Sequence, residues 1–453
     1  MNILNKIFSF FNINHKRTEK IAKNIIASSM IKVIDIAIGI LIVPLLLFYL
    51  GQKEYGIWLT MTSVISWFSF MNFGLGNGLR NKFALSLADG NKKMARTYLS
   101  TTYAILIIIM SSLFIIFSFS NSYIPWHLIL NVEDYFASEL NILAFLIFGF
   151  LSLKFVIDLF LVLLVADQRP AIRDLVNLVG KFFVFIFILI LIQNTDNSLT
   201  YLAIVYNGLP ILVVLLFSVY FYMTKYKELS PSYKFIEFKY VKDLLLLGWK
   251  FFIIQFSVII LFMTDNLIIS QLFGPEYVVN YQIVQKYYSI TLMVFLIFVS
   301  PMWSAYTEAY HNKDFNWIKK IIKKQHSLWL AVCAMVLLMT FFSNHVYSLW
   351  IGNKIDISII LSISWGLFVL LKSYNIIYTN FLNGIGAVKI QMYLAILSIL
   401  INIPLSIFFA KTLELGLSGV ILATGLIMLI YIIIKRIQYN KIISGKAVGI
   451  WCE

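Results

Sequence analysis

Charged side chains inside long apolar stretches are the groups of this chain that could do chemistry. Lys32 and Asp35 lie three residues apart in the first stretch, and Lys154 and Asp158 lie four apart in the fourth. At either spacing the two side chains share one face of a helix. A charge at the centre of a membrane span costs about 2.5–3.5 kcal/mol, so we expect these groups to face protein or water. Each acid either tunes its lysine or neutralises it and holds helices together.

Lysines outnumber acids at these depths, and the excess indicates an anionic cargo. The charges inside apolar stretches are Lys32, Lys154, Lys181, Lys250, Lys286, Lys372, Asp35, Asp158 and Asp265. A positive surplus attracts phosphate or acidic sugar, and lysine does so as a mobile point charge without the bidentate fork of arginine. We predict a substrate-binding cavity lined by Lys32, Asp35, Lys154, Asp158, Lys286 and Lys372. Lys250 lies near a span end, where a lysine extends its ammonium to the membrane surface, and Lys181 could do the same.

Asp265 is the one acid of the seventh apolar stretch. A carboxylate at membrane depth is a candidate for coupling transport to a proton or sodium gradient. The alternative is a structural ion pair with Lys286 or Lys32. The aromatic residues Trp58, Trp67, Tyr287, Tyr288, Tyr374 and Tyr378 could stack on sugar rings, although Trp and Tyr more often form belts at the membrane interface.

Catalytic patterns are not evident in the sequence. It holds no Asp-x-Asp pair and no nucleophile elbow, and its five histidines have no metal-ligand spacing. Gly74, Gly76 and Gly78 follow a membrane span and not a soluble strand, which argues against dinucleotide binding. We therefore expect a protein that is not an enzyme, with no metal and no cofactor beyond an ion gradient.

The elements that must position these charges are membrane-spanning helices. The chain of 453 residues is 60% hydrophobic and 13% charged, whereas soluble domains carry about twice that share of charge. Apolar runs of 18 residues or more recur along the chain, which predicts an all-α integral membrane protein. The net charge of +15 does not indicate nucleic acid, because the lysines lie between apolar runs. About twelve spans are predicted, at 24–49, 55–73, 97–119, 138–165, 171–192, 200–223, 244–272, 277–302, 326–350, 357–382, 390–410 and 416–436.

The spans predict two halves of six helices each. The expected divisions are a cytoplasmic amphipathic N-terminus (1–23), a first bundle (24–223), a cytoplasmic linker (224–243), a second bundle (244–436) and a cytoplasmic tail (437–453). Lys and Arg concentrate in alternate loops, so the positive-inside rule places both termini in the cytoplasm. The halves also echo each other: residues 51–55 match 274–277, and residues 88–93 match 311–314. Such echoes predict parallel repeats.

One region resembles a known family. Gly51-x-x-x-Tyr55-Gly56-x-Trp58, the run from Phe73 to Lys82, and Tyr98–Tyr103 are similar to the bacterial O-antigen and polysaccharide flippases. These belong to the multidrug/oligosaccharidyl-lipid/polysaccharide exporter superfamily, which also holds multidrug/cation antiporters and lipid II flippases. The sharp match covers residues from about 44 to 103, and span count and topology extend the likeness over the whole chain.

The resemblance implies two six-helix bundles around a central cavity that alternates between inward-open and outward-open states. It implies an oligosaccharide linked by pyrophosphate to a polyprenol as substrate, membrane lipids as partners, and a bacterial cytoplasmic (inner) membrane location. A polysaccharide polymerase and a chain-length regulator are further expected partners. The alternatives are a cation-coupled multidrug exporter of the same fold, and a membrane-embedded polysaccharide polymerase or acyltransferase.

Overall fold

The computed structural model describes residues 18–68, 75–167, 169–244, 263–299, 302–352 and 355–452. In this part of the chain the regular elements are helices. The chain divides into two compact units, Lys16–Phe256 and a second one that holds Ser257–Glu453. We call them the N-terminal and C-terminal units. The predictions for residues 1–17, for most of the seventh span and for Lys250 lie outside the described residues.

Ten helices of the described part are long and apolar enough to cross a membrane. The first, Met30–Ser66, covers two predicted spans, because two helices meet at Gly51 with a φ of 78° and a ψ of 174°. A left-handed φ of this kind is natural only for glycine. The all-α membrane class that the sequence predicts is confirmed.

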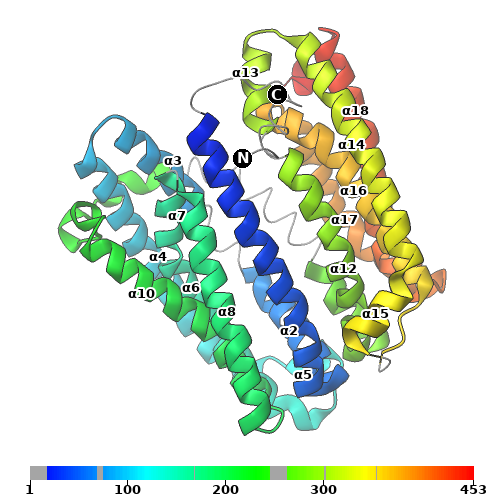
Figure 1. Ribbon diagram of the computed structural model, residues 1–453. Coiled ribbons are helices and arrows are strands. Elements are labelled where there is room, and N and C mark those ends of the chain that lie inside the picture. The colour runs from blue at the N-terminus through cyan, green and yellow to red at the C-terminus, as the bar shows by residue number, and fades with distance from the viewer. Residues whose placement is uncertain are drawn as a thin grey trace. The chain divides into compact units, whose positions relative to one another are not determined.

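The N-terminal unit is a bundle in which α8 lies beside both α2 and α10 (Figure 1). Its helices are α2 (Thr18–Ser66), α3 (Leu75–Ala88), α4 (Lys92–Ser120), α5 (Trp126–Leu130), α6 (Ala137–Ile157), α7 (Leu159–Ala166), α8 (Pro170–Asn194), α9 (Leu199–Ala203) and α10 (Leu209–Met223).

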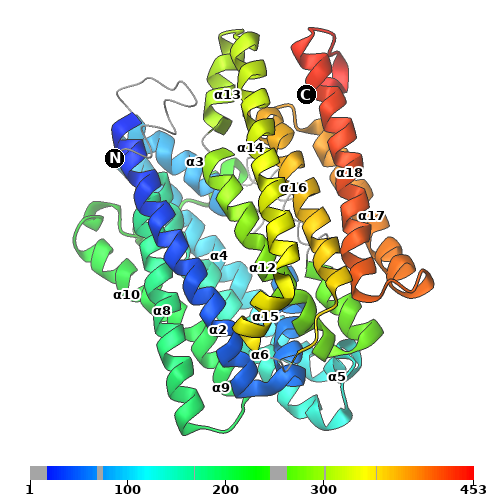
Figure 2. The ribbon, with the colours of Figure 1, turned by 45° about the vertical axis from the view of Figure 1, so that its right-hand side comes forward.

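The C-terminal unit is built around α16, which packs against α12, α13, α14 and α18 (Figure 2). Its helices are α12 (Pro275–Val299), α13 (Met302–His311), α14 (Phe315–Phe341), α15 (Ser343–Ile351), α16 (Ile359–Ile385), α17 (Lys389–Ile407) and α18 (Gly416–Ile443). Residues 263–273 form a further helical segment before α12.

Local sequence explains how corresponding helices of the two units begin. Asn91 caps α4 by accepting a hydrogen bond from the Met94 amide at 2.9 Å, and Asp314 caps α14 by accepting one from the Trp317 amide at 3.0 Å. Asn and Asp are favoured caps because their side chains satisfy amides that have no partner within the helix. The same cap therefore occurs in the two loops that echo each other in the sequence.

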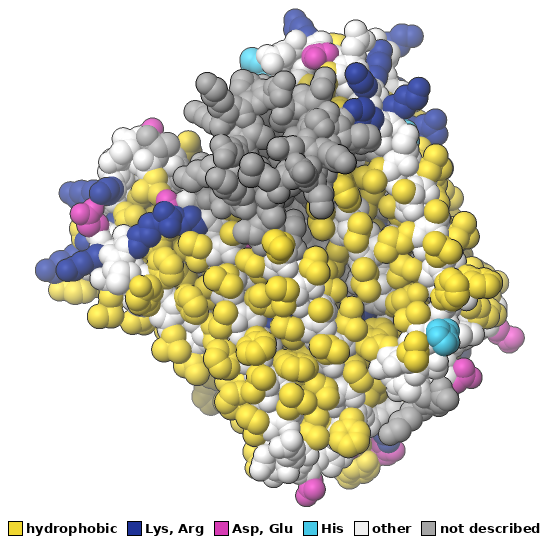
Figure 3. Space-filling model, in the orientation of Figure 1, with side chains coloured by type: hydrophobic (Ala, Val, Ile, Leu, Met, Phe, Trp, Pro, Cys, Tyr) yellow, Lys and Arg dark blue, Asp and Glu magenta, His cyan; other side chains and the backbone are white. Residues whose placement is uncertain are grey.

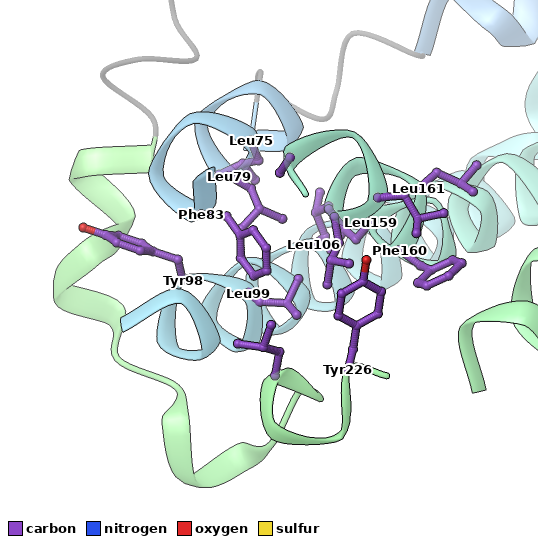
Figure 4. Packing of buried hydrophobic residues seen from close by; sticks show 14 of the residues in the cluster. Leu75, Leu79, Phe83, Tyr98, Leu99, Leu106, Leu159, Phe160, Leu161 and Tyr226 are labelled. Carbon is purple, nitrogen blue, oxygen red and sulfur yellow. The ribbon is translucent and has the colours of Figure 1, made fainter. Parts of the chain in front are cut away.

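A buried cluster of α3, α4 and α7 fixes one end of the N-terminal unit (Figure 4). The cluster includes Leu79 and Phe83 of α3, Leu99 of α4 and Phe160 of α7, and all four are fully buried. Gly78 brings α3 against the chain at Leu244, because a Cβ at this glycine would lie 2.3 Å from the Leu244 carbonyl oxygen. Any larger residue would force these two backbones apart.

The predicted linker covers the beginning of α4. The amides of Ser232 and Glu237 donate hydrogen bonds to the hydroxyls of Ser100 and Thr101, at 3.1 and 3.0 Å. An exposed ion pair joins Lys92 to Glu228 at 2.7 Å, and this hydrogen bond lowers the pKa of the Glu228 carboxyl. Burial, followed by the hydrogen bond to Asp167, raises the pKa of the Tyr226 hydroxyl at the start of the linker.

Exposed side chains show how the surface is divided. Figure 3 shows hydrophobic side chains over the middle of the visible face, with Lys and Arg gathered at one end of each unit. Large apolar side chains such as Phe48, Ile116 and Leu216 are 60–70% exposed. Such extensive exposed apolar surface is expected where lipid, and not water, is the solvent.

Candidate functional site

Asp35 pairs across two helices of the N-terminal unit. The Lys181 ammonium on α8 lies 2.9 Å from the Asp35 carboxylate on α2, and it also donates to the Asp35 backbone carbonyl at 2.6 Å. Lys32 lies three residues before Asp35 on the same helix, and its side chain is exposed. The partner of Asp35 is thus Lys181 and not Lys32, and the interpretation of Lys181 as a lysine that extends to the membrane surface is wrong.

Lys154 and Asp158 form the pair that their spacing predicts. Their ammonium and carboxylate lie 2.8 Å apart, and the side chains are 48% and 31% exposed. Asp158 stands at the break between α6 and α7, and its amide donates to the Lys154 carbonyl at 2.8 Å. The helical spacing of four therefore places a charged pair within a long apolar element, directly before the break.

Lys286 and Lys372 lie on the two helices at the centre of the C-terminal unit. Both are half-buried, Lys286 on α12 and Lys372 on α16. One turn before Lys286, the Gln282 amide donates to the Asn266 side chain at 2.7 Å. The Lys372 ammonium lies 5.5 Å from the centroid of the Phe368 ring, within the range of a cation–π contact.

Asp265 is enclosed by the C-terminal unit, with 3% of its surface exposed. One carboxylate oxygen accepts a hydrogen bond from the Tyr281 hydroxyl at 2.6 Å, and the other is buried without a hydrogen-bond partner among the described residues. A buried carboxylate that is only half satisfied is costly, so a bound proton or cation would stabilise it.

A row of aromatic rings links Asp265 to Lys372. The Tyr281 ring lies 5.2 Å from Trp365, and Trp365 lies 5.4 Å from Phe368, which is the ring beneath Lys372. Three aromatic rings therefore lie between these two predicted site residues, which are more than 100 positions apart in the sequence. It also explains part of the aromatic content as packing and not as sugar contact: Trp58, Tyr287, Tyr288 and Tyr378 are all buried.

Lys435 is a buried cation that the sequence reasoning missed. It is 2% exposed, donates to the Thr379 hydroxyl at 2.8 Å, and lies 5.0 Å from the Tyr431 ring. The signal that could have found it was its place within the apolar run of the last span, one turn after Tyr431. The described residues contain no cluster of three or more metal-ligating side chains.

Two curated relatives are similar over most of their length. A Salmonella typhimurium protein named as a candidate O-antigen transporter is 24% identical to this chain over 423 residues. The match covers 89% of this chain and 91% of that protein. A Yersinia pseudotuberculosis protein named as a candidate O-antigen export protein is 21% identical over 373 residues. The match covers 79% of this chain and 82% of that protein.

Solved structures share the fold at low identity. An inward-facing multidrug resistance transporter of the MATE family, within the MOP superfamily, matches with a TM-score of 0.71 and 15% identity. The match covers 92% of this chain and 96% of that one. A MOP superfamily transporter from Pyrococcus furiosus, described as having a binding pocket of reverse polarity, has a TM-score of 0.64 and 15% identity, with the same coverage.

Two family models match the sequence itself. The MatE model matches residues 251–408, and the model described as polysaccharide biosynthesis protein matches residues 21–307. The latter range exceeds half of the chain and contains the pairs Asp35–Lys181 and Lys154–Asp158, together with Asp265 and Lys286. The chain belongs to the polysaccharide biosynthesis protein family.

Proposed function

We propose that this protein is a flippase that moves an oligosaccharide, linked by pyrophosphate to a polyprenol, across the bacterial cytoplasmic membrane by alternating access. The observation that carries the proposal is the state of the acids at membrane depth. Asp35 is held by Lys181, Asp158 by Lys154, and Asp265 by the Tyr281 hydroxyl. Each of the two ion pairs is neutral. The other charges predicted at this depth in the described residues are Lys32, Lys286, Lys372 and Asp265, so positive charge is in excess, which suits a phosphate-bearing cargo.

Cation-coupled export of a small molecule is the second candidate. It is favoured by the fold that the chain shares with multidrug transporters. A site for cationic drugs needs carboxylates directed toward the cargo, whereas Asp35 and Asp158 are paired with lysines and Asp265 is enclosed, with 3% of its surface exposed. The names of the curated relatives also favour the polysaccharide interpretation.

Asp265 is the proposed coupling group. Its partly unsatisfied carboxylate would bind a proton or sodium ion. The packed rings of Tyr281, Trp365 and Phe368 connect this carboxylate to Lys372, so binding of the ion would be felt at a lysine that we propose contacts the substrate. The proposal includes an orientation with both termini in the cytoplasm, because Lys and Arg gather at one end of each unit. The enzymes that polymerise the exported repeat and regulate its length are the proposed partners.

The test is surface polysaccharide in a bacterial strain that lacks its own flippase and makes this protein's sugar. We expect the combined change of Lys32, Lys154, Lys286 and Lys372 to Gln to abolish surface polysaccharide while the amount of protein in the membrane stays normal. Glutamine keeps most of the side-chain bulk and removes the charge that attracts phosphate.

Four exposed lysines, at the beginning of α4 and α14 and in the linker, provide the matched control. Changing Lys93, Lys227, Lys319 and Lys320 to Gln removes the same amount of charge from exposed positions outside the apolar cores of the spans, and export should persist. Normal export by the variant with the four intramembrane changes would overturn the site assignment.

A further inference from the structure

An apolar groove lies between α4 and α6 of the N-terminal unit. It has a volume of about 430 Å³ and is lined by Ile107, Ser111 and Phe114 on α4 and by Phe145, Phe150 and Leu153 on α6, among other apolar residues. Gly149 lets Phe114 approach α6, because a Cβ at this position would lie 3.1 Å from that ring. The volume falls in the range of sites that enclose small organic ligands, about 300–1,000 Å³.

On α6 the groove is about as long as one membrane leaflet is thick, and it straddles the middle of the membrane element. Its lining on α6 runs from Phe145 to Ile157, which corresponds to about 18 Å at the helical rise of 1.5 Å per residue. One leaflet contributes about half of a hydrocarbon core that is roughly 30 Å thick. An extended hydrocarbon chain would therefore fill the groove from end to end, whereas a compact ligand would not.

A cation lies beside the groove at an unusual depth. Lys154 has two groove residues as its helical neighbours, Phe150 one turn before it and Ile157 three positions after it. The candidate membrane element is Asp134–Ala166, and Lys154 lies four residues from its midpoint, about 6 Å along the axis. Its ammonium has three donors, and Asp158 accepts from it at 2.8 Å, so a phosphate can bind without displacing the acid.

We propose that this groove binds the isoprenoid chain of a polyprenyl phosphate, and that Lys154 contacts the phosphate as it passes through the membrane. The inference rests on the proposed function. It adds a site for the lipid part of the substrate, which the lysines of the predicted cavity do not explain. Ordinary phospholipids fit poorly, since their phosphates remain at the membrane surface, about 15 Å from the midplane. Lys154 can meet only a lipid phosphate that leaves that level.

The test measures lipid binding to the purified full-length protein, by native mass spectrometry and by thermal shift. The probes are undecaprenyl phosphate, undecaprenol and dioleoyl phosphatidic acid. Ser111→Trp and Leu153→Trp fill the groove from opposite helices, and each should weaken binding of both polyprenyl lipids about tenfold or more. Lys154→Gln should lower the affinity for undecaprenyl phosphate to that for undecaprenol. The affinity for undecaprenol should not change.

The controls place the same bulk outside the groove on the same two helices. Ile116→Trp on α4 and Ile142→Trp on α6 alter residues that are 61% and 50% exposed and do not line the groove, so lipid binding should be unchanged. A melting temperature measured without lipid shows whether each variant is folded. The two groove variants are independent, so the loss of one to misfolding leaves the other to decide.

Two outcomes would overturn the inference. One is equal lipid binding by the groove and control variants, and the other is phosphatidic acid binding as tightly as undecaprenyl phosphate. If export depends on the intramembrane lysines while the groove variants bind lipid normally, the groove assignment fails and the flippase function stands. If the wild-type protein binds no polyprenyl phosphate and the lysine variant exports normally, the proposed function fails as well.

Discussion

At the scale of single residues, the acids at membrane depth decide what charge a substrate meets. Asp35 accepts from Lys181 with both its carboxylate and its backbone carbonyl. An acid engaged in this way joins α2 to α8, while Lys32 remains exposed on the same helix. The charge offered by this part of α2 is therefore that of Lys32 alone.

This arrangement predicts an energetic coupling that can be measured. A double-mutant cycle of Asp35→Asn and Lys181→Gln should give an interaction energy of about 0.5–3 kcal/mol in reversible unfolding in mixed micelles, because the two groups are in contact. The matched cycle of Asp35→Asn and Lys32→Gln should give a value near zero. Equal coupling in the two cycles would show that Asp35 does not select Lys181.

The sequence could predict one of the two N-terminal pairs and not the other. Lys154 and Asp158 lie on one helix at a spacing of four, so local geometry brings them together. Asp35 and Lys181 are 146 positions apart, and their contact depends on how α2 packs against α8, which hydrophobic periodicity does not specify. Lys435 shows the same limit, since its burial depends on Thr379 of another helix.

At the scale of elements, the linker shows which contacts hold a segment in place. The side chains of its ion pair, Lys92–Glu228, are 66% and 73% exposed, and solvent weakens the attraction within a pair that is exposed to this extent. Its amides also donate to the largely buried hydroxyls of Ser100 and Thr101. Losing the acceptor of a buried amide costs about 1–3 kcal/mol, so the hydroxyls should dominate.

Limited proteolysis can separate these two contributions. Ser100→Ala combined with Thr101→Val should speed tryptic cleavage at Lys234 and Lys239 about tenfold, whereas Lys92→Gln should change the rate little. Thr102→Val is the matched control, because this hydroxyl bonds within α4 to the Tyr98 carbonyl. Faster cleavage of the Lys92→Gln variant than of the double variant would show that the ion pair, and not the hydroxyls, holds the linker in place.

The pH dependence of the linker has a definite sign. The Glu228 pKa is lowered by Lys92, so the pair stabilises the folded linker above the unfolded carboxyl pKa of about 4.3. That contribution is lost as pH falls through the lower folded pKa. The hydroxyl bonds do not titrate, so the linker should remain docked at acid pH until other groups are protonated.

At the scale of the whole molecule, composition and apolar run length were enough to predict an all-α membrane protein. They also placed most spans within a few residues; for example, the predicted span 97–119 lies inside α4. The sequence placed the division between the first two spans at residues 50–54, where two helices meet at Gly51. The break at Asp158 was not predicted, because it depends on backbone geometry at a single position. The resemblance of residues from about 44 to 103 to a family was the most specific functional signal, and the family match over residues 21–307 confirms it.

At this scale we propose that transport is coupled to a proton or sodium gradient and that Asp265 is the coupling group. A carboxylate that is 3% exposed, with one oxygen bonded to Tyr281 and the other without a hydrogen-bond partner in the part of the chain that the structure describes, should bind a proton or sodium ion readily. Asp265→Asn keeps the size and removes the charge. In proteoliposomes we expect this variant to bind polyprenyl phosphate normally and to lose the acceleration of transport that an imposed proton or sodium gradient produces.

Two further variants decide whether the effect belongs to this site. Tyr281→Phe removes the 2.6 Å hydrogen bond but keeps the acid, so transport should stay coupled to the gradient. The cation concentration that gives half-maximal transport should shift about tenfold or more, because hydrogen bonds to charged groups contribute about 1.5–3 kcal/mol. Asp356→Asn neutralises an exposed acid of the same unit and should behave like the wild type. Gradient-driven transport by Asp265→Asn at the wild-type rate would remove Asp265 from the mechanism, because a group that cannot change its charge cannot transmit the gradient.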